Sequence, residues 1–65
     1  MKKNVGENIR NLRLSYNLTQ AQFGASIGVS ASCIQHWEAN YTEPDLTALR
    51  KIKEIYNVMY EEIID

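Results

Sequence analysis

The sequence has few of the residues on which several common classes of protein depend. Its 65 residues include one cysteine, one histidine, one proline and three glycines. A single cysteine cannot form an internal disulfide, and one Cys with one His cannot supply the four ligands of a structural zinc site. No apolar run reaches the roughly 18 residues that a membrane span needs, and the first residues do not resemble an export signal. We therefore expect a cytoplasmic protein with no disulfide, metal or membrane segment.

The short length also limits what the chain can do. A chain of this size can bury one small core, so residues 1–65 are expected to form a single domain. The sequence shows neither a paired acid and base nor a cleft-forming architecture. We accordingly expect a protein that is not an enzyme, with no catalytic residue and no cofactor.

Apolar residues recur at intervals of three and four along most of the chain, which predicts an all-α fold. The expected helices cover 5–16, 19–27, 30–39, 45–56 and 60–64. Thr19 and Ser30 are predicted N-caps, and Asn17 and Asn40 are predicted to end helices because Asn tolerates the left-handed conformation. The residues expected on inward stripes are Val5, Ile9, Leu12, Tyr16, Phe23, Ile27, Ile34, Trp37, Leu46, Leu49, Ile52 and Tyr56.

The joint between the second and third expected helices carries a specific local signal. Gly24 lies inside a helix, where glycine costs about 1 kcal/mol relative to alanine, so a close approach of a second backbone is expected there. Gly28 supplies the positive φ that a sharp turn between crossed helices requires. The two glycines indicate a helix-turn-helix. The residues left facing outward around the third helix are Ser30, Ala31, Ser32, Gln35 and His36.

Five stretches then form an ordered set along the chain. They are "IRNLR" at 9–13, "LTQAQFGASIGVS" at 18–30, "IQHWE" at 34–38, "EPDLTALRKI" at 43–52 and "NVMYEEII" at 57–64. This set resembles the Cro and phage-repressor type of helix-turn-helix regulator, also called the xenobiotic-response-element family. The resemblance implies a compact, lambda-repressor-like bundle of five helices that binds double-stranded DNA and regulates transcription. In such a domain the third helix enters the major groove.

The resemblance also implies roles for individual residues. The expected base-reading residues are Ala31, Ser32, Gln35 and His36. The expected contacts to the DNA backbone come from Arg13, Thr19, Gln20, Ser30, Cys33, Asn40, Tyr41 and Thr42. An ion pair between Arg13 and Glu38 is expected to join the first and third helices. Val58, Met59 and Tyr60 are expected to form a small dimer contact on a palindromic operator, because one recognition helix reads only about 4 or 5 base pairs.

The sequence departs from the family pattern in its distribution of charge. Members more often carry Arg or Gln at the positions of Ala31 or Ser32, and Arg-Gly-Lys where this chain has residues 39–41. Residues 14–37 contain no Asp, Glu, Lys or Arg, although residues 1–38 carry four basic and two acidic residues, a net charge of +2. Residues 39–65 carry three basic and six acidic residues, a net charge of −3. Because DNA affinity draws on cation–phosphate contacts, weak nonspecific binding is expected.

Other interpretations of these residues remain open. Cys33 and His36 could be a metal pair or a thiol with its base, although no further Cys or His completes such a site. A cationic group in the fourth helix is expected to be a solvated face; it consists of Arg50, Lys51 and Lys53. The rival function is a protein-interaction module, such as an antitoxin-like regulator that binds a partner protein and has weak DNA affinity.

Overall fold

The computed structural model describes residues 4–64, and these residues form five α-helices around one hydrophobic core. The helices are α1 (Val5–Ser15), α2 (Gln20–Ile27), α3 (Ala31–Glu38), α4 (Leu46–Tyr56) and α5 (Tyr60–Ile64). The expected all-α fold is confirmed. Four expected ranges were longer by one or two residues, because they included capping residues at the helix ends.

Polar side chains cap three of the helices at their N-termini. The side-chain oxygens of Thr19, Ser30 and Asp45 accept hydrogen bonds from backbone N–H groups three residues later, at 3.0, 3.1 and 2.8 Å. Each cap satisfies one of the N–H groups that a helix leaves without an internal partner. At Thr19 the contact is reciprocal, since Gln22 Oε1 accepts from the Thr19 backbone N–H at 2.9 Å. The predicted N-caps Thr19 and Ser30 are therefore confirmed.

Asparagine in the left-handed conformation follows three of the helices. Asn17, Asn40 and Asn57 have φ values of 58°, 62° and 55°. Asn adopts this conformation more readily than other residues with a side chain. These three residues turn the chain sharply after α1, α3 and α4, as expected for Asn17 and Asn40.

The core is built from one or more side chains of every helix. The largest fully buried side chains are those of Ile9, Phe23, Ile34, Ile52 and Ile63. Leu46 was expected inward and is 65% exposed. It lies about 120° around α4 from Ile52, so Ala48, one turn before Ile52, takes the inner position instead.

Tyr16 also departs from the expected inward stripe, because it is half exposed at the end of α1. Its ring packs edge-on against the ring of buried Tyr56, with the centroids 5.0 Å apart, and its hydroxyl donates to the Tyr56 carbonyl oxygen at 3.2 Å. Tyr16 therefore joins the ends of α1 and α4 at the margin of the core.

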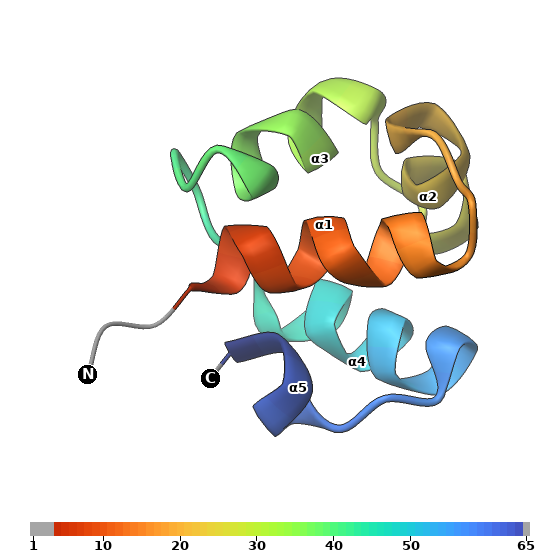
Figure 1. The fold of residues 1–65 in the computed structure, drawn as a ribbon, viewed down its shortest axis with the longest axis vertical. Coiled ribbons are helices and arrows are strands. Elements are labelled where there is room, and N and C mark those ends of the chain that lie inside the picture. Colours follow the sequence, from red (N-terminus) through yellow and green to blue (C-terminus); the bar gives the residue numbers. More distant parts are fainter. Residues whose placement is uncertain (1–3, 65) are drawn as a thin grey trace.

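The helices are arranged on two sides of α1. Figure 1 shows α2 and α3 on one side of α1, and α4 and α5 on the other. α1 contacts both α3 and α5, while α4 packs on α2 and α2 on α3. This arrangement supports α3 from below and leaves its outer face uncovered (Figure 1).

Candidate nucleic-acid interface

The turn between α2 and α3 depends on two glycines. Gly28 has a φ of +80° and ends α2. A Cβ atom on Gly24 would lie 2.6 Å from the Val29 carbonyl oxygen, and the Val29 N–H donates to the Gly24 carbonyl oxygen at 2.9 Å. The expected close backbone approach at Gly24 and the positive φ at Gly28 are both confirmed. The turn thereby sets the angle between α2 and α3.

α3 is fixed on its inner side and polar on its outer side. Ile34 and Trp37 are buried in the core, as expected. The expected outward residues Ser32, Gln35 and His36 are exposed. Ala31 and Cys33 are half-buried, so they lie at the margin of this outer face. The face presents a hydroxyl, an amide and an imidazole without a carboxylate between them, which suits a hydrogen-bonding surface.

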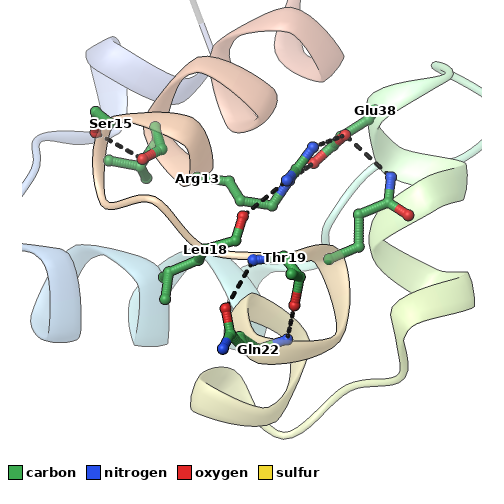
Figure 2. Close-up of polar contacts among 8 residues, drawn as sticks. Arg13, Ser15, Leu18, Thr19, Gln22 and Glu38 are labelled. Carbon is green, nitrogen blue, oxygen red and sulfur yellow. Dashed lines mark hydrogen bonds and ion pairs between the residues drawn. The ribbon is translucent and has the colours of Figure 1, made fainter.

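An ion pair joins the end of α3 to α1. Arg13 Nε donates to Glu38 Oε2 at 2.7 Å and Arg13 Nη2 donates to Glu38 Oε1 at 3.1 Å, as Figure 2 shows. The side chains are 11% and 7% exposed, so the pair is largely withdrawn from water. Hydrogen bonding to Glu38 raises the pKa of Arg13 above its ordinary value. The expected pair is thus present, and its guanidinium is charged throughout the physiological range.

The same two side chains also hold the start of α2. Arg13 Nη1 donates to the Leu18 carbonyl oxygen at 2.8 Å (Figure 2), and Gln20 Nε2 donates to Glu38 Oε1 at 3.2 Å. α1, α2 and α3 therefore meet at one polar junction. Within residues 4–64, Arg13 uses three of its five N–H groups, which leaves two for a ligand. Gln20 likewise keeps a second amide hydrogen beyond the one that Glu38 accepts.

A shallow hollow of about 380 Å³ opens above this junction. Its lining residues are Arg10, Arg13, Gln20, Gln35, Glu38 and Ala39. Three of them, Arg13, Gln20 and Gln35, were expected to contact DNA, and they lie together around this hollow. Arg10 was not identified from the sequence, although its spacing of three from Arg13 places both on one side of α1. Arg10 is exposed and adds a cation to this surface.

The loop after α3 is tied to the start of α1. Asn40 Oδ1 accepts a hydrogen bond from the Gly6 backbone N–H at 3.0 Å. A Cβ atom on Gly6 would lie 2.6 Å from the carbonyl oxygens of both Trp37 and Glu38, so the end of α3 rests directly on the glycine backbone. Gly6 was not singled out from the sequence. The Asn40 oxygen accepts this hydrogen bond, and its amide nitrogen, which has no hydrogen-bond partner among residues 4–64, is able to donate to a ligand.

The remaining residues expected at the DNA backbone surround α2 and α3. Thr19 and Ser30 lie at the helix N-termini, where their oxygens accept the capping hydrogen bonds and their hydroxyl hydrogens are still able to donate. Tyr41 and Thr42 are exposed in the loop after α3. Helix N-termini favour anions, so this distribution suits a phosphate backbone. Their contacts with DNA stay predictions.

The expected dimer residues lie away from α3. Val58 and Met59 follow α4, and Tyr60 begins α5, on the opposite side of α1 from α3 (Figure 1). Met59 is exposed, while Val58 and Tyr60 are half-buried. Lys53 Nζ lies 5.6 Å from the centroid of the Tyr60 ring. A dimer through these residues also stays a prediction.

Two further expectations concern metals and membranes. Among residues 4–64, no three His, Cys, Asp or Glu side chains gather in a way that could hold a metal ion. In the same part of the chain, no helix has the length and apolar character needed to cross a bilayer. Cys33 and His36 therefore have no third ligand near them among the described residues.

Comparisons with known proteins point to one family. A family model described as "Helix-turn-helix" matches residues 9–63. The chain is similar to the HTH-type transcriptional activator BcrR of Enterococcus faecalis. The two are 31% identical over 58 residues, a match that covers 89% of this chain. It is also similar to the antitoxin PezA of Streptococcus pneumoniae serotype 4. The two are 28% identical over 60 residues, a match that covers 92% of this chain. The chain spans only 28% and 38% of the lengths of these two relatives.

A solved structure is similar over nearly the whole domain. The P22 c2 repressor protein, determined in complex with the synthetic operator 9T, matches with a TM-score of 0.89 and 28% sequence identity. The match covers 98% of this chain and 97% of the repressor chain. The five helices described above are therefore arranged as in a repressor bound to its operator.

Proposed function

Since the chain belongs to the helix-turn-helix family, of the Cro and phage-repressor type, we propose that it binds double-stranded DNA at specific sequences and regulates transcription. The observation that carries the proposal is the match to an operator-bound repressor at a TM-score of 0.89. The outer face of α3, which is exposed and polar, agrees with it. Such a helix fits the major groove. Because a protein that binds an operator must be in the same compartment as the DNA, we include a cytoplasmic location in this proposal.

α3 reads bases through three exposed side chains and one methyl group. Gln35 can bond bidentately to adenine N6 and N7, and the Ser32 hydroxyl or a His36 ring N–H can donate to guanine N7 or O6. Ala31 offers its methyl group to a thymine methyl group. With Ile34 and Trp37 buried, the core holds α3 in the rotation that turns these groups outward. Cys33, at the margin of the face, lies at the groove edge and contributes little.

The DNA backbone is held mainly by neutral donors. Thr19, Gln20 and Ser30 offer hydroxyl and amide hydrogens at two helix N-termini, and Cys33, Asn40, Tyr41 and Thr42 border the same surface. Arg13 adds its two remaining N–H groups. Because residues 14–37 carry no Lys or Arg, few counterions are released on binding. The affinity should therefore fall less steeply with salt than in regulators that have many cationic phosphate contacts.

Two copies of the domain bind one palindromic operator. A single α3 covers too few base pairs for selectivity, and two domains about one helical turn apart double the number of bases read. Val58, Met59 and Tyr60 supply the contact between the copies. Sedimentation of the protein with operator at saturation should show two protomers per duplex. A ratio of one would refute the dimer.

Substitutions on α3 test the proposed function. Gln35→Ala and His36→Ala should reduce the preference for a matched duplex over a scrambled one, whereas Cys33→Ser is the control and should change little. Anisotropy titrations at two salt concentrations would measure both affinity and its salt dependence. The assignment fails if only the Cys33 variant loses binding, or if the other two weaken every duplex equally.

A second candidate function is binding to a partner protein, as in an antitoxin-like regulator. The charge-free segment 14–37 and the similarity to the antitoxin PezA favour it. The two functions predict different results in one pair of experiments. A DNA regulator shifts a duplex from its own upstream region in a gel, whereas an interaction module with weak DNA affinity co-purifies with a protein.

A further inference from the structure

The imidazole of His36 has one aromatic neighbour in the described part of the chain. The ring centroids of His36 and Tyr41 lie 5.9 Å apart, with 50° between the ring planes. Tyr41 is 78% exposed, so its ring does not belong to the core. An exposed tyrosine that rests on an exposed histidine of the DNA-reading helix calls for an explanation other than domain stability.

The backbone holds Tyr41 in place against His36. The Tyr41 N–H donates to the His36 carbonyl oxygen at 2.9 Å, and the Thr42 N–H approaches the same oxygen at 3.4 Å. Asn40, with its positive φ of 62°, turns the chain back toward α3, and its side chain is anchored to the Gly6 N–H at 3.0 Å. The position of Tyr41 is therefore set by contacts to α3 and α1 rather than by its own ring.

We propose that Tyr41 is a positioning residue for His36, and that its ring, rather than its hydroxyl, determines how sharply α3 discriminates at the base pair that His36 reads. This inference rests on the proposed function, because it takes His36 to be a base-reading residue. An exposed histidine side chain samples several rotamers, and a base contact that fixes one of them loses binding free energy to side-chain entropy. The Tyr41 ring lies beside the imidazole, with the centroids 5.9 Å apart, and so limits the positions that the imidazole can take.

Tyr41 was expected from the sequence to contact the DNA backbone, where its hydroxyl would donate a hydrogen bond to a phosphate. The two roles use different parts of the side chain. A phosphate contact needs the hydroxyl and carries no sequence information. Positioning of His36 needs the ring, and its loss affects the one base pair that His36 reads. Tyr41→Phe keeps the ring and removes the hydroxyl, whereas Tyr41→Ala removes both.

The test compares Tyr41→Phe, Tyr41→Ala, His36→Ala and the double His36→Ala/Tyr41→Ala variant. The probes are the duplex selected by the wild-type protein and a duplex changed at the base pair where His36→Ala relaxes the preference. We expect Tyr41→Ala to lose most of that discrimination, which should be about tenfold for one good side-chain–base contact. Tyr41→Phe should keep it. The double variant should match His36→Ala, because Tyr41 acts through His36.

A measurement without DNA tests the contact itself. The imidazole proton resonances of His36 should shift in Tyr41→Ala and stay in place in Tyr41→Phe, because ring currents depend on the ring alone. Urea unfolding followed by Trp37 fluorescence would establish that both variants are folded. Imidazole resonances that are unaffected by Tyr41→Ala would overturn the proposal.

The DNA results separate this inference from the proposed function. If the wild type prefers its selected duplex and Tyr41→Ala keeps that preference, the positioning role is wrong and the proposed function stands. If Tyr41→Phe loses the discrimination as fully as Tyr41→Ala does, the hydroxyl rather than the ring is responsible, and the positioning role is also wrong. If the wild type binds no duplex, both the proposed function and this inference are overturned.

Discussion

Replacing Arg13 should destabilise the domain far more than replacing an ordinary surface arginine. Its side chain donates three hydrogen bonds, two to Glu38 and one to the Leu18 carbonyl oxygen. Arg13→Ala leaves the Glu38 carboxylate, 7% exposed, with Gln20 as its remaining side-chain donor among residues 4–64. Leaving one member of a buried ion pair without its partner costs about 3 to 5 kcal/mol.

That cost is large compared with the stability of so short a chain. At about 0.05 to 0.15 kcal/mol per residue, a domain of this length is stable by roughly 3 to 10 kcal/mol. Arg13→Ala should therefore lose about a third of this stability at the least, and all of it if the wild type lies at the low end of the range. Arg13→Lys should lose about 2 kcal/mol, because one ammonium group cannot reach both carboxylate oxygens and the Leu18 carbonyl oxygen.

Urea unfolding followed by the fluorescence of buried Trp37 would measure these differences. Arg50→Ala is the matched control, since Arg50 is an exposed arginine on α4 and should change the free energy of unfolding by less than about 0.5 kcal/mol. The double variant Arg13→Met/Glu38→Leu replaces the pair by apolar groups of similar size. It should be more stable than either single variant, because no charge is left buried without its partner.

The loss of unfolding free energy in Arg13→Ala should also be independent of pH near neutrality. Hydrogen bonding to Glu38 raises the pKa of folded Arg13 above its value in the unfolded chain. A raised pKa contributes stability that is fully present below the unfolded value and is lost only as the pH rises through the folded value. The contribution should thus be constant from about pH 6 to pH 9. An Arg13→Ala variant whose free energy of unfolding is within about 1 kcal/mol of the wild type would show that the Arg13–Glu38 pair contributes no more than a weak surface ion pair.

Two further substitutions test contacts that depend on the folded structure. Gly6→Ala should destabilise the domain by about 2 kcal/mol or more, because its Cβ would lie 2.6 Å from two carbonyl oxygens at the end of α3; unchanged urea unfolding would contradict the contact. Arg10→Gln should weaken binding to all duplexes alike and reduce the slope of log K against log salt by about 1, whereas Arg50→Gln on α4 should leave the slope unchanged. An unchanged slope in Arg10→Gln would place the hollow away from the phosphates.

The features that were predicted correctly from the sequence are mostly local. Thr19 and Ser30 act within one helical turn, and Gly28 is constrained by the turn in which it lies. Such features can be identified because each depends on the residue type and on neighbours only a few positions away. The Arg13–Glu38 pair is different, since it spans 25 residues and was expected only from the resemblance to a known family.

The features that were missed depend on packing between distant segments. Gly6 and Asn40 are 34 residues apart, and nothing in the sequence near either residue indicates that they meet. Gln20 and Glu38 are separated by 18 residues. Leu46 was misplaced because a stripe of spacing three drifts around a helix with 3.6 residues per turn. The base contacts remain predictions because they form only when DNA is bound.

Selection of duplexes from a random pool by the wild-type protein would measure sequence-specific DNA binding itself. One two-fold symmetric sequence should be enriched, and repeating the selection with Gln35→Ala or His36→Ala should relax the preference at one base pair in each half-site. A pool that remains random after repeated rounds with folded protein would contradict sequence-specific DNA binding.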